Sequence, residues 1–152
     1  MKVYQLTYRS KAIEDITPNS IYEIVKVANE FNPTVGITGC LVFDNGYFIQ
    51  ILEGEKEVVE ELYFKIKQDK RHSFASVLSK DFTAKRFFDK WDMAYMNLTD
   101  LSVGDKNELV QKAQAEIKNI TTKESFTTKV FWYNINELLG EDRFYRTAGP
   151  IG

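Results

Sequence analysis

The residue whose chemistry stands out is Gln50, because it lies within an otherwise hydrophobic hairpin. Two β-rich runs at 37–43 and 47–52 are joined by the sequence Asp-Asn-Gly at 44–46, a strong turn signal. Side chains alternate along a strand, so Gln50 shares a face with the apolar Phe48. Its amide carries donors and an acceptor, and leaving such a group unpaired when buried costs about 1–3 kcal/mol. A loop carbonyl, a buried water or a ligand must meet it, and the residues alone leave these alternatives open.

Candidates for conventional catalysis are few. His72 is the only histidine and Cys40 the only cysteine, and the chain contains no metal-ligand spacing and no glycine-rich phosphate loop. A lone histidine after charged residues is typical of a surface or loop position. Four cations precede it: Lys65, Lys67, Lys70 and Arg71. This cluster is either a solvated helix end or the contact for an anionic ligand beside the helix.

Hydrophobic periodicity predicts the elements that position these groups. Strands are expected at 2–8, 37–43, 47–52, 74–82 and 91–98, and helices at 21–31 and 55–69. The order β-α-β-β-α-β-β is that of an α+β, ferredoxin-like sheet with one extra strand. Right-handed crossovers place both helices on one face of this sheet, where the groove between them suits a flat ligand.

The segment 99–152 has a different character. Its apolar spacing predicts a helix that begins near Asp105 and a second, shorter helix at 130–139, with the last dozen residues irregular. These residues are too few for an independent domain. We therefore expect a helical appendage on the open face of the sheet, and a division of the chain into 1–98 and 99–152.

Composition indicates an ordinary globular protein. Of 152 residues, 43% are hydrophobic and 28% charged, which suits one domain with an appendage. The aromatic share of 14% indicates either large core residues or a pocket for a planar ligand. A net charge of −2 gives no pull toward nucleic acid or membrane, and no apolar run reaches spanning length. The single cysteine fits a reducing compartment, and no signal-peptide pattern is present, so we expect a cytoplasmic protein.

Five short motifs are distributed along 1–98: Tyr8 at the end of the first strand, Asn32-x3-Gly36-Ile37-Thr38-Gly39, Phe48-x-Gln50-x-Leu52-Glu53-Gly54, Asp69-x-Arg71-His72 and Trp91-x-Met93. Together they resemble the BLUF domain, the blue-light sensor that uses FAD. The resemblance implies a flavin that lies between the two helices. It also implies a role for each matching residue.

By this resemblance, Tyr8 and Gln50 form the photoactive pair beside the flavin ring. The other cofactor-binding positions are Asn32 and Arg71 at the edge of the ring, Ile24 and Ile66 above and below it, Phe48 and His72 packed near it, and Lys65 near the phosphates. Trp91 and Met93 match last-strand residues proposed to relay the signal.

Three positions depart from the pattern of the family. Phe31 replaces a polar residue often found before the flavin-binding asparagine, so one polar contact is lost. Lys65 lacks the bidentate fork of the usual arginine. Cys40 stands where a larger aliphatic residue is common, and we assign it no role. None of these changes the photoactive pair.

The resemblance implies a non-enzymatic photoreceptor. A phenol can give an electron and a proton to an excited flavin, and a glutamine between phenol and ring can relay the proton and afterwards remain rotated or tautomerised. No cyclase or phosphodiesterase domain follows, so we expect a short BLUF protein that self-associates and signals through a partner protein. The alternatives are a flavin-dependent oxidoreductase and a light-insensitive flavin-binding module.

Overall fold

A computed structural model describes residues 2–90, 93–120 and 125–148, with the side chains of 117–120 and 141–148 excepted. The elements follow in the order β1 (Val3–Ala12), α1 (Pro18–Phe31), a 3₁₀ turn (Asn32–Val35), β2 (Thr38–Asp44), β3 (Tyr47–Gly54), α2 (Lys56–Lys67), β4 (His72–Thr83), β5 (Ala94–Asn97), α3 (Val103–Ile120) and α4 (Phe126–Ala148). The predicted α+β, ferredoxin-like order of strands and helices is confirmed. No helix among the described residues is long and apolar enough to cross a membrane.

The five strands form one sheet in the order β4-β1-β3-β2-β5. β5 runs parallel to β2, and all other neighbours are antiparallel. The predicted turn between β2 and β3 is built by Asn45 and Gly46, whose φ angles of 47° and 86° give the mirror-image turn that fits a twisted hairpin. The hairpin lies in the interior of the sheet, which explains why both of its faces are hydrophobic.

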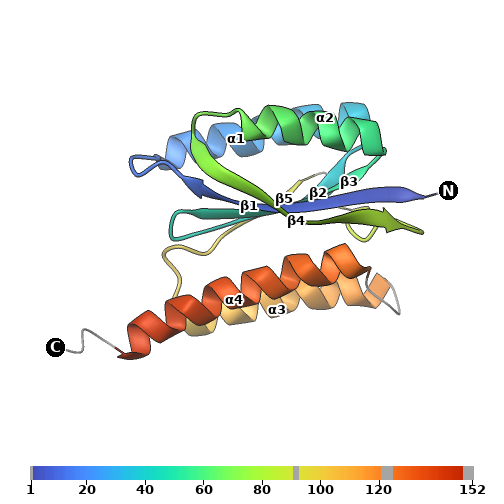
Figure 1. The fold of residues 1–152 in the computed structure, drawn as a ribbon. Coiled ribbons are helices and arrows are strands. Elements are labelled where there is room, and N and C mark those ends of the chain that lie inside the picture. The colour runs from blue at the N-terminus through green and yellow to red at the C-terminus, as the bar shows by residue number, and fades with distance from the viewer. Residues whose placement is uncertain (1, 91–92, 121–124, 149–152) are drawn as a thin grey trace.

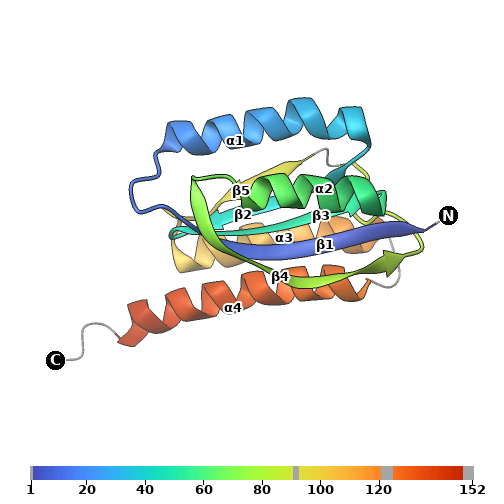
Figure 2. The same cartoon turned by 45° about the horizontal axis from the view of Figure 1, so that its top comes forward.

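The sheet separates two layers of helices. α1 and α2 cover one face, and α3 and α4 cover the other (Figure 1). The turned view places α1 and α2 side by side above the strands (Figure 2). Each face has its own hydrophobic core, with Leu41 and Leu52 on the α1/α2 face and Val42 and Ile51 on the α3/α4 face. This is the predicted two-sided burial.

The end of α1 brings Asn32 into the interior. Thr17 caps the start of this helix by accepting a hydrogen bond from the backbone N–H of Ser20 at 3.1 Å. At its other end, the backbone turns through the 3₁₀ segment and closes at Gly36, which has a φ of 70°. Only a residue without Cβ adopts this conformation freely. The tight turn leaves the side chain of Asn32 buried under α1.

The appendage differs from the sequence-based expectation. α4 has 23 residues against 18 in α3, so it is the longer helix, and it extends through most of the segment expected to be irregular. The periodicity missed the start of α4 because its first turn is mostly polar, although its Thr127 and Thr128 are buried. Their hydroxyls hydrogen-bond to the sheet, so their burial leaves no hydrophobic pattern.

The bounds of three strands also differ from those expected. β1 and β4 extend beyond the expected ends because they pair with each other as far as Ala12 and His72. The last strand, expected at 91–98, spans only Ala94–Asn97, and Trp91 lies outside the described residues.

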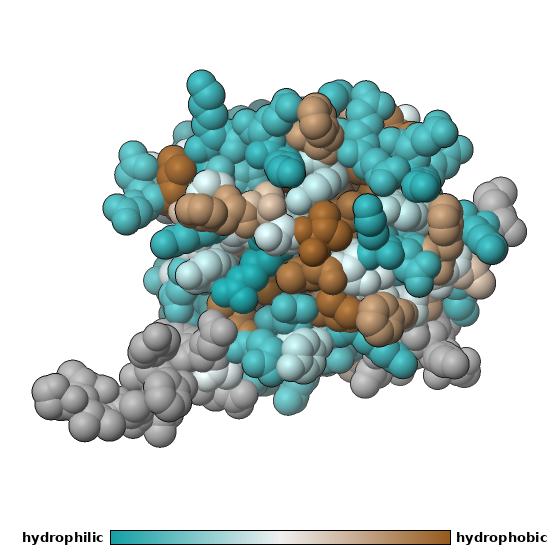
Figure 3. Space-filling model, viewed as in Figure 1, coloured by the Kyte–Doolittle hydropathy of each residue, from teal (hydrophilic) through white to brown (hydrophobic). Residues whose placement is uncertain are grey.

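β4 forms one edge of the sheet. Hydrophobic side chains gather over it on the face shown in Figure 3, and Val77 and Phe82 of this strand are 39% and 47% exposed. A bulge, where the pairing with β1 shifts register, holds the exposed Phe74 at a φ of 56°. An edge strand offers unpaired backbone groups to another chain.

Candidate functional site

A cavity lies between α1 and α2, above β1, β2 and β3. Its lining is mainly hydrophobic, and it is formed by Tyr8, Ile24, Val27, Ala28, Phe31, Asn32, Leu41, Phe48, Gln50, Leu62, Ile66, Asp69, Arg71 and His72. The polar groups come from the sheet floor, from the turn after α1 and from the loop after α2. A hydrophobic cleft with a few convergent polar groups is typical of a cofactor site.

Tyr8 and Gln50 face each other on the floor of the cavity. They are directly opposed across β1 and β3, and the Tyr8 hydroxyl donates a hydrogen bond to Gln50 Oε1 at 2.6 Å. Gln50 Nε2 in turn donates to Met93 Sδ at 3.2 Å. The buried amide therefore finds a phenol at one end and a thioether, a weak acceptor, at the other.

The phenol of Tyr8 is held in its neutral form. Burial raises the pKa of Tyr8 well above its usual value, and the nearby Tyr63 and Asp69 act in the same direction. The Tyr63 ring lies 5.3 Å from the Tyr8 ring, centroid to centroid. A neutral phenol keeps a proton that can be donated along the short hydrogen bond to Gln50.

Asn32 brings an unsatisfied donor to the cavity. Its side chain is 2% exposed, and Nδ2 has no hydrogen-bond partner among the described residues. A buried amide nitrogen without an acceptor costs about 1–3 kcal/mol. The position therefore fits a ligand that presents a carbonyl oxygen at this wall.

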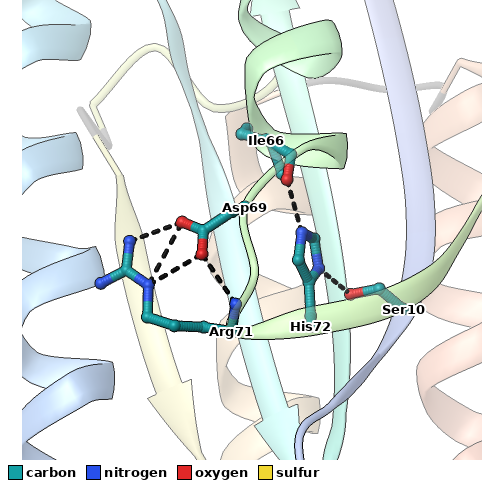
Figure 4. Close-up of polar contacts among 5 residues, drawn as sticks. All are labelled: Ser10, Ile66, Asp69, Arg71 and His72. Atoms are coloured by element: carbon teal, nitrogen blue, oxygen red, sulfur yellow. Dashed lines mark hydrogen bonds and ion pairs between the residues drawn. The ribbon is translucent and has the colours of Figure 1, made fainter.

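Arg71 and Asp69, which both line the cavity, are joined by a fork of hydrogen bonds (Figure 4). Arg71 Nε donates to Asp69 Oδ1 at 2.9 Å, and Nη2 donates to Asp69 Oδ2. These hydrogen bonds hold the pKa of Asp69 below its usual range and raise the pKa of Arg71. The pair fixes the guanidinium in place while its remaining nitrogen, Nη1, stays available to a ligand.

His72 is fixed between a helix end and a strand (Figure 4). Its Nε2 meets the carbonyl oxygen of Ile66, which can only accept, so Nε2 carries the hydrogen. Nδ1 lies 2.7 Å from the Ser10 hydroxyl. Both ring nitrogens are thereby engaged, and the imidazole acts as a wall of the cavity whose edge also meets the Phe48 ring.

Eight of the nine predicted cofactor-binding residues line this one cavity: Tyr8, Ile24, Asn32, Phe48, Gln50, Ile66, Arg71 and His72. Lys65 does not line it. Its side chain is exposed on α2, where it forms an ion pair with Glu61 at 3.8 Å and lies 6.0 Å from the centroid of the Phe31 ring. The functional roles of all nine residues remain predictions.

Several lining residues were not singled out from the sequence. Val27, Ala28 and Leu62 lie three or four positions from Ile24 and Ile66, so helical spacing could have identified them. Asp69 was part of a quoted motif but received no role. No local sequence pattern predicts the hydrogen bond from Gln50 to the sulfur of Met93, because this contact depends on how the last strand is placed against β2.

The fold and cavity define an α+β, ferredoxin-like domain with a mainly hydrophobic pocket between α1 and α2. The family model described as "BLUF: Sensors of blue-light using FAD" matches residues 3–94. The chain belongs to this family, whose cofactor is FAD.

Proteins similar in sequence to this chain include an antirepressor and an adenylate cyclase subunit. The "Blue light- and temperature-regulated antirepressor BluF" of Escherichia coli (strain K12) is 37% identical over 106 residues, 70% of this chain and 26% of that protein. The "Photoactivated adenylate cyclase subunit beta" of Euglena longa is 41% identical over 68 residues, 45% of this chain and 8% of that protein. The chain thus spans only a small part of the length of either relative.

Solved structures agree with the fold. The structure described as "BlsA photo-activated state" matches with a TM-score of 0.65 at 29% identity, covering 91% of this chain and 95% of that chain. At 91% of this chain, the structural match includes residues beyond 94, where the family model ends.

Proposed function

We propose that this protein is a blue-light photoreceptor in which Tyr8 and Gln50 form the photoactive pair. The observation that carries the proposal is the chain of hydrogen bonds from the Tyr8 hydroxyl through the Gln50 amide to Met93 on the floor of the cavity. Membership of a family of FAD-dependent light sensors supports it.

The residues around the cavity suit the flavin ring. Asn32 would donate from Nδ2 to a ring carbonyl, Arg71 would meet the edge of the ring from Nη1, and Ile24 and Ile66 would pack on its two sides. Phe31 fits the same purpose, because it adds an aromatic wall where other members of the family carry a polar residue. Lys65 stands near this aromatic wall and would meet the phosphates from outside the cavity.

FAD, when bound, supplies a ring that blue light turns into a strong oxidant. Tyr8 is placed to give up an electron and to pass its hydroxyl proton to Gln50 Oε1, 2.6 Å away. The amide of Gln50 then rotates or tautomerises, and the electron and the proton return to Tyr8, so that no group stays oxidised or reduced. Rotation exchanges the two ends of the amide, so that Oε1 faces Met93 in place of Nε2, whereas tautomerisation leaves both atoms in place and moves a proton from Nε2 to Oε1. Each change alters the hydrogen bond that Met93 now accepts.

Met93 is the first residue to sense this change. It is 3% exposed and lies just before β5, the edge strand that pairs with β2. Losing the hydrogen bond from Gln50 Nε2 frees the thioether to repack, which shifts the backbone that enters β5. We assign Met93 the role of signal relay, with Trp91 as its predicted companion.

We infer that the output passes to a partner protein and that the chain itself carries no catalytic activity. The names of its relatives couple similar domains to an antirepressor and to adenylate cyclase. The exposed β4 edge, with Val77 and Phe82, supports self-association. We expect no direct binding to nucleic acid or membrane, in line with the net charge of −2. We also expect a cytoplasmic location.

The decisive experiment is an absorption spectrum in the dark and under blue light. We expect a yellow protein that releases FAD on acid treatment and that shows a red shift under blue light, reversed in the dark. A protein that binds flavin but shows no spectral shift would support the alternative of a light-insensitive flavin-binding module. Flavin bleaching that depends on an added substrate would instead support the oxidoreductase. A colourless protein that cannot be reconstituted with FAD would contradict every flavin-based reading.

Asn32→Ala should weaken FAD binding. The substitution removes the buried Nδ2 donor that we assign to the ring, which costs about 1–3 kcal/mol and raises Kd by about 5- to 150-fold. Titration of the apoprotein with FAD, followed by fluorescence, measures the change. Thr34→Ala in the same turn is the control, because Thr34 is exposed and bonds only to the Phe31 carbonyl. Equal affinity in wild type and Asn32→Ala would remove Asn32 from the site.

A further inference from the structure

The first turn of α4 is attached to the sheet by hydrogen bonds, whereas the buried side chains that follow, as far as Leu139, pack by hydrophobic contact. Thr127 Oγ1 lies 2.8 Å from Ser79 Oγ of β4, and Thr128 Oγ1 accepts from Gln5 Nε2 of β1 at 3.1 Å. Further along α4 the buried side chains are Phe131, Trp132, Ile135, Leu138 and Leu139. Hydrogen bonds are directional and hydrophobic contacts are not. The first turn is therefore the part of α4 that depends on how groups in the sheet are oriented.

Gln5 connects this turn to Glu53. The two residues are directly opposed across β1 and β3, both are fully buried, and Gln5 Nε2 donates to Glu53 Oε2 at 3.1 Å. Gln5 Oε1 accepts from the hydroxyl of Ser125. The reverse orientation of the amide would place two acceptors, Oε1 and the carboxylate, against each other. Glu53 thus sets the orientation of Gln5, and Gln5 sets the position of Ser125.

Glu53 in turn joins the photoactive strand to the segment that follows β4. Four donors converge on its carboxylate: Gln5 Nε2 at 3.1 Å, Thr38 Oγ1 at 2.8 Å, and the backbone N–H groups of Phe87 at 3.0 Å and Phe88 at 2.7 Å. Glu53 lies on β3 with Gln50, but on the opposite face, toward α3 and α4. The carbonyl of Gln50 is itself held from that face by the Thr7 hydroxyl at 2.8 Å.

We propose that Gln5 is a positioning residue that transmits a rearrangement at Gln50, through Glu53, to the first turn of α4. The inference rests on the proposed photoreceptor function. A shift of β3, or of the backbone at Phe87 and Phe88, displaces the Glu53 carboxylate. The Gln5 amide must follow to keep its acceptor, and it carries Ser125 with it.

The consequence falls on the cap of α4. Ser125 Oγ accepts from the backbone N–H of Thr128 at 3.1 Å, which makes it the N-terminal cap of the helix. Displacing Ser125 weakens this cap, so illumination loosens the first turn of α4 while the hydrophobic remainder of the helix stays packed. The output is a light-dependent change at one end of the appendage.

Hydrogen exchange of the FAD-loaded protein in the dark and under continuous blue light tests this. In the wild type we expect faster exchange in the first turn of α4 under light. Gln5→Met and Thr128→Val should each reduce that light-minus-dark difference about fivefold, the factor that one ordinary hydrogen bond contributes to a local opening equilibrium. Thr128→Ser, which keeps the hydroxyl, should retain it, and all variants should keep the spectral shift.

Thr127→Val is the matched control, since Thr127 is an equally buried neighbour whose hydroxyl bonds to β4 and not to Gln5. It should keep the light-minus-dark difference. The proposal is overturned if the wild type shifts its spectrum without any change in this turn, if Gln5→Met behaves as wild type, or if Thr127→Val loses as much as Thr128→Val. An absent spectral shift in the wild type would overturn the photoreceptor function itself.

A second measurement needs no light. A double-mutant cycle on the free energy of unfolding should give coupling between Gln5→Met and Thr128→Val and none between Gln5→Met and Thr127→Val. Coupling of equal size in both pairs would show general packing, and it would contradict a specific role for Gln5.

Discussion

Tyr8→Phe should abolish the light-induced red shift while the protein still binds FAD. The substitution keeps the aromatic ring in the cavity floor but removes the hydroxyl that donates to Gln50 Oε1 at 2.6 Å. Without a transferable proton at this position, nothing drives the rotation or tautomerisation of the Gln50 amide. The expected loss is complete, and a dark and lit absorption spectrum measures it.

Tyr63→Phe is the control for this variant. Tyr63 is a second phenol whose ring lies 5.3 Å from that of Tyr8, and burial raises its pKa as well. Tyr63 lies on α2, and the phenol that donates to Gln50 Oε1 is that of Tyr8, so Tyr63→Phe should keep the red shift. A normal shift in Tyr8→Phe would refute the mechanism at that residue, and its loss in Tyr63→Phe alone would move the role to α2.

Gln50 illustrates how much of the site could be predicted from residues alone. Period-two alternation and the Asn45-Gly46 turn fix its face and its burial, and both predictions are confirmed. The identity of its partners could not be derived in this way. Tyr8 lies 42 positions away in the sequence, and the pairing of β1 with β3 depends on crossovers that leave no local pattern. The resemblance to a known family supplied that pairing.

The same limit applies to the polar contacts on the other face. Gln5, Glu53 and Thr128 have residue types that a sequence pattern assigns to solvent, yet all three are fully buried. Each is acceptable in the interior only because neighbours in the folded sheet and at the start of α4 satisfy its hydrogen bonds. Such mutual satisfaction is a property of the folded network, so it cannot be predicted from hydrophobic periodicity. The start of α4 was missed for this reason.

The packing of α3 and α4 on the sheet was predictable, because an open hydrophobic face of a sheet must be covered by another layer. One continuous core now contains Val42 and Ile51 of the sheet together with Val110 and Trp132 of the appendage. The division of the chain at residue 98 stays a prediction.

Lys106→Met should destabilise the protein more than any other substitution considered. Lys106 in the first turns of α3 is fully buried, and its Nζ donates to Asp44 Oδ1 at 2.8 Å. Asp44, at the end of β2, is equally buried. Removing the ammonium breaks a buried ion pair by deleting one of its two charges, which costs about 3–5 kcal/mol. Urea unfolding followed by circular dichroism measures the loss.

The double variant Asp44→Leu/Lys106→Met separates the charge from the packing. Two hydrophobic side chains of similar volume need no desolvation of charge, so the double variant should recover most of the stability that Lys106→Met loses, and it can exceed the wild type. An exposed pair, Lys112 with Glu108 on the same helix, provides the control, because Lys112→Met should change the free energy of unfolding by about 0–1 kcal/mol. If Lys106→Met were as stable as Lys112→Met, the buried pair would not hold α3 to the hairpin. If the double variant were as unstable as Lys106→Met, the loss would come from packing, and the broken ion pair would not explain it.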